Sequence, residues 1–508
     1  MTRHILPVLV AAALLAACGG HDNASPSQSS TPPTRGQLLG TPTMTGTYSP
    51  SDLLSELTSD PLGKLLLQLT FTPTCTVTVY HYEYQTVGGA GESTTASAAL
   101  MVPSGSGGSC QGARPIAMYA HGTNTTKTFN MAVLSGNSEA LLMAAIFASQ
   151  GYIVVAPNYA GYDTSTLAYH PYLNADQQSK DMIDSLAAAR SAFSTANASD
   201  NGKLYVTGYS QGGFVAMATV KAMQAAGTAV TAAAPMSGPY ALAAFGDAIF
   251  SGEVNTSGPP NFNLIVTSYQ HSYMNVYSAP TDVYASQYAN TADELLPNAS
   301  GISAVYNQGE LPQNALFNST PPSPAYAAMT PATTPANLAP VFAMGFGANA
   351  LVLNSYRQSY LQDAAANPDG GFPTITSGLP AASPANTLRQ DLKTNDLRNW
   401  SPTEPVLLCA GDSDPTVFYL NTQLMQNYWT ANAPSAPVYV LDVDSAVGTN
   451  DPYADEKQGF AAAKTAVAAA AIVGGATDGG ALAVLQDYHA GLVPPFCLYA
   501  VKTYFDGH

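Results

Sequence analysis

The chain has 508 residues, enough for two or three domains or for one large domain with insertions, and 46% of them are hydrophobic. Only 10% are charged, and the formal net charge is -17. The negative net charge argues against nucleic acid as a partner, because phosphates would be repelled. The low share of charged residues leaves Ser, Thr, Asn, Gln and Tyr to cover the surface.

The N-terminus has the pattern of an export signal. An apolar run from Ile5 to Ala17 is too short to span a bilayer and is typical of a signal-peptide core. The run ends in Ala17-Cys18-Gly19, which resembles the lipobox of bacterial lipoproteins, in which the cysteine is acylated. An ordinary signal peptide with a chance cysteine is the alternative.

We therefore expect residues 1–17 to be a lipoprotein signal peptide and Cys18 to carry the lipid. Residues 18–45 are rich in Ser, Pro, Thr and Gly, which predicts a flexible tether. Gly19 is not the aspartate that commonly retains such proteins at the inner membrane. We expect an exported protein anchored by lipid to the outer membrane, on its periplasmic or its outer face.

Strand-like and helix-like stretches alternate beyond the tether. Residues 74–84 and 94–102 alternate apolar and polar side chains, as an antiparallel hairpin does. Continuous apolar runs, typical of strands buried on both faces, lie at 115–120, 152–156, 203–207, 229–234, 406–410 and 438–443. The helix-like stretches include 139–149 and 176–196. This pattern predicts an α/β fold, with a mostly parallel central sheet flanked by helices.

The hexapeptide Gly208-Tyr209-Ser210-Gln211-Gly212-Gly213 joins an apolar strand to a helix-like stretch. A Gly-x-Ser-x-Gly pattern in this strand–turn–helix context is a nucleophile elbow, which exposes a strained serine at its apex. The context predicts that Ser210 is a nucleophile, whereas the bare pattern would also fit an ordinary turn.

The strand pattern is interrupted between residues 240 and 400. This stretch is rich in Pro, Asn, Tyr, Ser and Ala and is too long for a simple loop. We expect it to be a mainly helical cap over the C-terminal edge of the sheet, where open α/β sheets bind ligands. The hydrolase core would then have two parts, residues 46–239 and 401–508. An independent helical domain is the alternative.

A serine nucleophile needs a base, and the base needs an acid that orients it. The apolar strand 406–410 runs into Gly411-Asp412-Ser413-Asp414-Pro415-Thr416-Val417, which places a carboxylate after a strand end. We expect Asp414 to be the acid. Asp412 is the competitor, although an aspartate there can instead cap the turn.

His489 is the expected base. It lies in Asp487-Tyr488-His489-Ala490-Gly491, after the last strand and just before a closing helix, so it completes the chain order Ser, Asp, His. The other histidines lie in the signal peptide, the tether, the early hairpin, the insertion, other loops or the C-terminus.

The oxyanion hole should be built from fixed backbone N–H groups. We expect one donor at Gln211, directly after the nucleophile, and the second at Thr123 or Gly122 in Tyr119-Ala120-His121-Gly122-Thr123. His121 would support this loop and would not serve as the base.

Four cysteines remain after Cys18, an even number that suggests disulfides in an exported protein. Of the three possible pairings we favour Cys75–Cys110 and Cys409–Cys497, since each pair joins neighbouring blocks of the expected fold; buried free thiols are the alternative. The chain has no Cys-x-x-Cys or His-x-x-x-His spacing, so we expect no metal site.

Taken together, the motifs at 208–213, 121–123, 411–417 and 489 resemble those of α/β-hydrolases of the secretory-lipase type, a group of cap-bearing lipases and esterases. The resemblance covers residues 70–240 and 400–508 and is weakest in the insertion. It implies a serine carboxylic-ester hydrolase that uses a Ser210–His489–Asp414 triad and an acyl-enzyme, with no cofactor.

The expected substrate is a small-molecule, lipid or polyester ester. The alternatives are a serine peptidase or an acyltransferase on the same fold, or a non-catalytic envelope-binding lipoprotein.

Overall fold

The computed structural model describes residues 34–69 and 71–508, and the part from Thr34 to His508 forms one compact unit. The expected signal peptide, the expected lipidation site Cys18 and most of the expected tether lie outside the described residues. Within those residues, no helix is long and apolar enough to cross a membrane.

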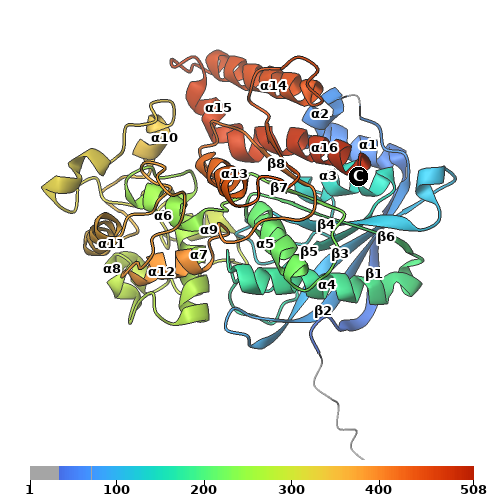
Figure 1. Ribbon diagram of the computed structural model, residues 1–508, viewed down its shortest axis with the longest axis horizontal. Coiled ribbons are helices and arrows are strands. Elements are labelled where there is room, and N and C mark those ends of the chain that lie inside the picture. Colours follow the sequence, from blue (N-terminus) through green and yellow to red (C-terminus); the bar gives the residue numbers. More distant parts are fainter. Residues whose placement is uncertain (1–33, 70) are drawn as a thin grey trace, which may run out of the picture. The chain divides into compact units, whose positions relative to one another are not determined.

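A nine-stranded sheet organises the chain, in the order β1-β2-β3-β5-β4-β6-β7-β8-β9 (Figure 1). Strands β1, β2, β3 and β5 pair antiparallel, and the pairs from β5 through β4 to β9 are parallel. The strands are β1 (Leu38–Tyr48), β2 (Thr76–Val87), β3 (Ser93–Ser104), β4 (Arg114–Ala120), β5 (Ile153–Pro157), β6 (Asp200–Tyr209), β7 (Ala232–Met236), β8 (Val406–Ala410) and β9 (Val438–Asp442).

Helices lie on both faces of this sheet. The longer ones in the core are α1 (Pro50–Ser59), α2 (Pro61–Leu66), α3 (Ser138–Ile146), α4 (Ala175–Ala196), α5 (Gln211–Ala225), α13 (Leu420–Asn432), α14 (Ala454–Val473), α15 (Ala481–Asp487) and α16 (Val493–Asp506). Helices α4 and α5 pack on one face, while α1, α2, α3, α14 and α16 gather on the other (Figure 1).

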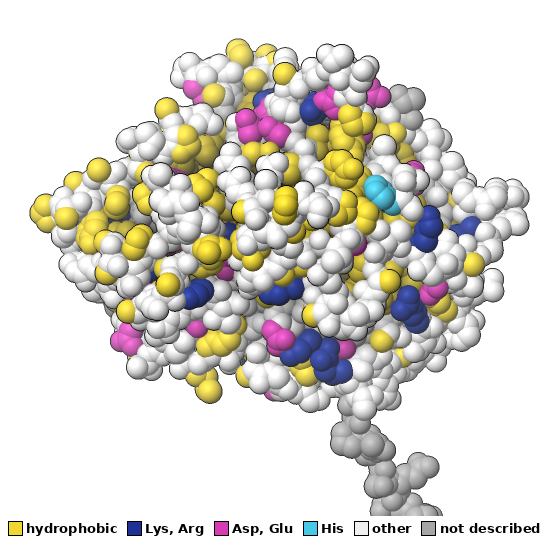
Figure 2. Space-filling model, in the orientation of Figure 1, with side chains coloured by type: hydrophobic (Ala, Val, Ile, Leu, Met, Phe, Trp, Pro, Cys, Tyr) yellow, Lys and Arg dark blue, Asp and Glu magenta, His cyan; other side chains and the backbone are white. Residues whose placement is uncertain are grey.

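Side chains that alternate along each strand form two hydrophobic clusters, one on each face of the sheet. In β4, Ile116 and Met118 face one hydrophobic cluster, whereas Ala117 and Tyr119 face the other. Because both faces are covered, the central strands are apolar without interruption, which is why they could be recognised in the sequence. The face shown in Figure 2, by contrast, carries only scattered acidic and basic side chains, among hydrophobic side chains and white atoms of the backbone and other side chains.

The expected tether is too long at its C-terminal end. Residues Leu38–Tyr48, most of which fall within the expected tether, form β1 and pair antiparallel with β2. An edge strand has one neighbour and needs few buried side chains, so its Thr- and Gly-rich sequence resembles a linker. Pro42 is buried where the register shifts between Leu39 and Thr43, as proline at an irregular edge allows.

The stretch between β7 and β8 is helical and contributes no strand to the described sheet. It comprises α6 (Leu242–Phe250), α7 (Gly258–Tyr273), α8 (Ser286–Ala289), α9 (Ile302–Asn307), α10 (Ala339–Met344), α11 (Asn354–Ala366) and α12 (Thr387–Thr394). Its buried side chains, such as Phe250, Phe262 and Leu351, belong to the same hydrophobic cluster as residues of the sheet. These helices therefore form a cap that is packed onto the core.

Candidate active site

Ser210 occupies a sharp turn between β6 and α5. Its backbone has φ 59° and ψ -122°, a conformation that an L-residue adopts only under constraint. The turn depends on two glycines, because a Cβ on Gly208 would lie 2.3 Å from the Gly212 carbonyl oxygen and one on Gly212 would lie 1.8 Å from that of Ala120. The sequence thus holds the Ser210 hydroxyl at the C-terminal edge of the sheet.

The structure brings Ser210, His489 and Asp414 into one hydrogen-bonded row. His489 Nε2 lies 2.8 Å from Ser210 Oγ, and His489 Nδ1 lies 2.6 Å from Asp414 Oδ2. The other oxygen of Asp414 accepts the backbone N–H groups of Thr416 (2.8 Å) and Val417 (3.0 Å). With Nδ1 donating to the carboxylate, Nε2 is free to take the serine proton.

His489 lies in a π-helical turn, Tyr488–Leu492, between α15 and α16, where the sequence indicated a loop. The hydroxyl of Tyr209, the residue before the nucleophile, donates to the His489 carbonyl oxygen at 2.5 Å. Asp412 makes no contact with the imidazole; its carboxylate accepts the Ser413 hydroxyl (2.9 Å). Asp414 therefore has the geometry of the orienting acid, and Asp412 does not.

The expected oxyanion donors differ in whether their backbone N–H groups already donate a hydrogen bond. Within the described residues, the backbone N–H groups of Gln211 and Thr123 donate no hydrogen bond, as donors awaiting a substrate oxygen should. The N–H of Gly122 instead donates to Glu139 Oε1 at 2.8 Å. Of the two positions that the sequence left open, Thr123 is thus the one with a free donor.

Glu139 was not singled out in the sequence. It lies at the start of α3, and its Oε1 accepts both the Gly122 N–H and the Tyr119 hydroxyl (2.6 Å). Burial raises the pKa of this carboxyl, partly offset by the two hydrogen bonds. An acidic residue in a first helical turn is common, and no sequence signal linked this one to the loop 17 residues earlier.

His170, which sequence reasoning assigned to an ordinary loop, is buried beside the elbow. Its Nδ1 lies 2.8 Å from the Ala160 carbonyl oxygen, so this nitrogen carries the proton, and its Nε2 accepts the Gln211 side-chain amide at 2.7 Å. Burial lowers the pKa of His170 to about 3, which keeps the ring neutral. Gln211, the expected oxyanion donor, is therefore also held by its side chain.

His121 has the loop-supporting environment expected of it. Its ring stacks on Tyr159 with centroids 4.1 Å apart, and its Nδ1 and Nε2 face the carbonyl oxygens of Gly122 (2.6 Å) and Asn158 (3.2 Å). Burial lowers its pKa to about 4. The ring makes no hydrogen bond to Ser210 in the described structure, so it is not placed to act as the base.

Ser210 and His489 line a cavity of about 940 Å³ between the core and the cap. The core contributes the loops at residues 122–126 and 136–139, and the cap contributes apolar side chains of α6, α7 and α12. A cavity of this size accommodates a drug-sized ligand.

Both expected disulfides are present. Cys75–Cys110 joins the start of β2 to the loop before β4, and Cys409–Cys497 joins β8 to α16. Among the described residues, no group of three or more His, Cys, Asp or Glu side chains is arranged to hold a metal.

Comparisons with known proteins agree with this architecture. The model of the prolyl oligopeptidase family matches residues 139–290. The crystal structure of the rice cell wall degrading esterase LipA from Xanthomonas oryzae superposes with a TM-score of 0.67 at 25% identity, covering 94% of this chain and 100% of that one. The chain is an α/β-hydrolase.

A second solved structure supports the fold of this α/β-hydrolase. A hydrolase of unassigned activity from Legionella pneumophila has a TM-score of 0.60 at 20% identity, covering 80% of this chain and 91% of that one. No curated protein matches the chain by sequence. The segment of the family match contains the nucleophile elbow and ends in the cap, before Asp414 and His489.

Proposed function

We propose that this α/β-hydrolase cleaves carboxylic esters through an acyl-enzyme on Ser210. The observation that carries the proposal is the pair of hydrogen bonds made by His489, 2.8 Å to the serine oxygen and 2.6 Å to the Asp414 carboxylate. A hydrogen-bonded serine, imidazole and carboxylate, of which the serine and the imidazole line a large cavity, is an arrangement suited to acyl transfer.

In the proposed reaction, Ser210 Oγ attacks the ester carbonyl while His489 Nε2 takes its proton. The N–H groups of Gln211 and Thr123 stabilise the oxyanion, and Asp414 stabilises the imidazolium that forms. His489 then protonates the departing alcohol, and a water molecule, activated by the same imidazole, releases the acid. Each proton is accounted for by this one base, so the mechanism requires no cofactor.

The first prediction is that Ser210→Ala lowers kcat on activated esters by about 10⁴-fold or more and abolishes labelling by a fluorophosphonate probe, because the nucleophile is lost. Circular dichroism should remain unchanged. Ser257→Ala is a matched control, since Ser257 lines the same cavity and its side chain caps no helix. Near wild-type turnover by the Ser210 variant would refute the proposal.

A peptidase is the second candidate, because the matching family is named for oligopeptidases. We favour the ester because the structure similar over nearly the whole chain is that of an esterase. The two are separated by comparing kcat/KM on acyl esters with that on the corresponding acyl amides and on proline-containing peptides. Product analysis with added alcohols tests an acyltransferase in the same assay.

Export and lipid anchoring at Cys18 remain proposals that rest on the sequence. Labelled palmitate should be incorporated into the full-length chain and not into a Cys18→Ser variant. Incorporation into both proteins, or into neither, would contradict anchoring at this residue.

A further inference from the structure

The described lining of the active-site cavity has no permanently positive side chain, and its one histidine is His489. Among the described residues that form its walls there is no lysine or arginine. The wall does contain two carboxylic acids, Glu139 and Asp487. Whatever their protonation, these two groups are either neutral or negative, so a substrate carboxylate or phosphate would meet no counter-charge.

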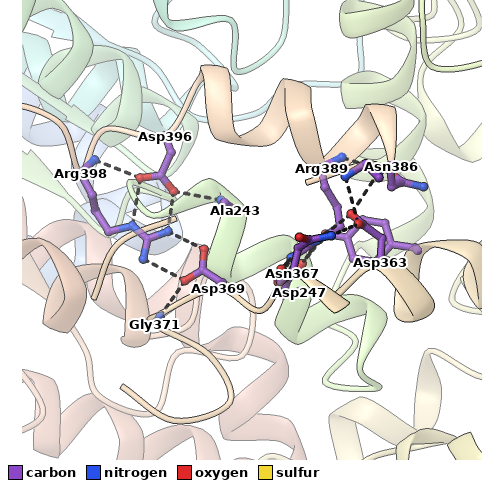
Figure 3. A network of polar contacts seen from close by, with 12 residues as sticks. Ala243, Asp247, Asp363, Asn367, Asp369, Gly371, Asn386, Arg389, Asp396 and Arg398 are labelled. Atoms are coloured by element: carbon purple, nitrogen blue, oxygen red, sulfur yellow. Dashed lines mark hydrogen bonds and ion pairs between the residues drawn. The ribbon is translucent and has the colours of Figure 1, made fainter. Parts of the chain in front are cut away.

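The cap's few cations are engaged elsewhere. Residues 240–400 contain four lysine and arginine side chains, Arg357, Arg389, Lys393 and Arg398. Arg389 forms ion pairs with Asp247 and Asp363, both at 2.7 Å, as Figure 3 shows. The fully buried Arg398, in the same figure, pairs with Asp369 and Asp396.

Three further cations, two in the cap and one beside a lining residue, donate to carbonyl oxygens of the protein. Arg357 donates to the carbonyl oxygens of Phe250 (3.1 Å) and Met329 (2.5 Å). The Lys393 ammonium donates to the Ala382 carbonyl oxygen. Lys127 follows the lining residue Thr126, but its ammonium donates to the Leu167 carbonyl oxygen at 3.1 Å.

Helix N-termini are the other common anion sites, and the first turns of α7 and α3, which line the cavity, have few free N–H donors. Helix α7 begins Gly258-Pro259-Pro260, and the two prolines remove two N–H donors from its first turn. The first turn of α3 contains Glu139, and the Asn137 side chain already accepts its Ala140 N–H. The start of α5 belongs to the oxyanion hole.

The cavity offers neutral contacts instead. Asn124, Asn261 and Thr125 present amide and hydroxyl groups, while Leu242, Ile249 and Leu392 present apolar surface. We propose that the site selects uncharged or cationic esters and discriminates against esters that carry a carboxylate or phosphate on either side of the scissile bond. This inference rests on the proposed ester hydrolysis and specifies its substrate class.

The test uses three acetate esters of similar size that differ in charge: 4-acetoxybenzoate, 4-acetoxybenzamide and 4-acetoxyphenyltrimethylammonium. After correction for the non-enzymatic hydrolysis rates, we expect kcat/KM for the anion to be about tenfold or more below that for the amide, and the cation to equal or exceed the amide. The penalty should shrink at high ionic strength. An anion within twofold of the amide would overturn the inference.

Variants of residues that line the cavity test whether the discrimination against the anionic ester arises there. Asp487→Asn and Asn261→Lys should each raise the anion-to-amide ratio of kcat/KM, whereas Asn261→Gln, which keeps the wall neutral, should leave it unchanged. An unchanged ratio in both charge variants would contradict the assignment to this cavity. If none of the three esters is hydrolysed, the proposed esterase function fails instead, so the two failures are distinguishable.

Discussion

Glu139 contributes to the site through a single oxygen atom. Its Oε1 fixes the Gly122 N–H and the Tyr119 hydroxyl, and thereby the loop that carries the Thr123 donor. We predict that Glu139→Ala lowers kcat on a neutral ester by about 10- to 100-fold with little change in KM, because a displaced donor weakens transition-state stabilisation. Steady-state kinetics of the Glu139→Ala variant and the wild type measure this change.

Glu139→Gln is the control, since its amide oxygen can still accept both hydrogen bonds. It should retain most of the wild-type kcat. If alanine and glutamine reduce kcat equally, the carboxylate has a role other than positioning the loop.

Sequence reasoning found the residues with local motifs and missed the residues that support them. Ser210 and Asp414 are each marked by glycines and by the strand that precedes them, which are local signals. Glu139 and His170 act on loops 17 and 41 residues away, through contacts that only the folded chain creates. The choice between Gly122 and Thr123 likewise required knowledge of the Glu139 contact.

Among the elements of the cap, α6 and α12 are joined by a buried ion pair. We predict that Arg389→Met lowers the free energy of unfolding by about 3–5 kcal/mol, because it leaves Asp247 and Asp363 buried without their partner. Arg190→Met, which removes the exposed pair with Asp200, should cost no more than about 1 kcal/mol.

Urea denaturation followed by fluorescence is a suitable measurement, because the chain has two tryptophans and their rings lie 6.0 Å apart at the junction of cap and core. An equal decrease in the free energy of unfolding in Arg389→Met and Arg190→Met would show that the buried ion pair stabilises the fold no more than the exposed one.

The strands and long helices of the core were predictable because each has a clear period or a continuous apolar run. Strand β1 could not be predicted from its sequence, because its hydrogen bonds come from its partner β2 and few of its side chains are buried. The cap was expected to be helical, but its individual helices were not located. Several have only four to six residues, too few for a hydrophobic period to emerge.

For the whole molecule, buried titratable groups set the pH of greatest stability. Burial raises the pKa of several carboxyl groups above the unfolded value of about 4, so the folded chain binds their protons first and gains stability as pH falls. In five of these groups the pKa rises to about 6 or 7. They are Asp181 and Asp442, at about 6, and Asp391, Glu253 and Glu456, at about 7. His121 and His170, lowered to about 4 and 3, act oppositely below about pH 6.5.

Because five groups outnumber two, we predict a higher Tm at pH 5.5 than at pH 8. Below about pH 4 the Tm should fall, since the Asp363 carboxylate, whose pKa its hydrogen bonds lower to about 2, must then be protonated. Calorimetry over this pH range measures both effects. Asp391→Asn should raise the Tm more at pH 8 than at pH 5.5, and a Tm that decreases steadily from pH 8 to 5.5 would contradict the prediction.

The Cys409–Cys497 disulfide closes a covalent loop that contains both Asp414 and His489. The proposed acid and base thus lie within one loop closed by a bond that forms under oxidising conditions. Chain made in a reducing cytosol would lack this link, and an intact disulfide of this kind contributes about 2–5 kcal/mol. We therefore expect the stability of the proposed site to depend on the redox conditions under which the chain folds, and protein purified from an oxidising compartment is the appropriate material for kinetics.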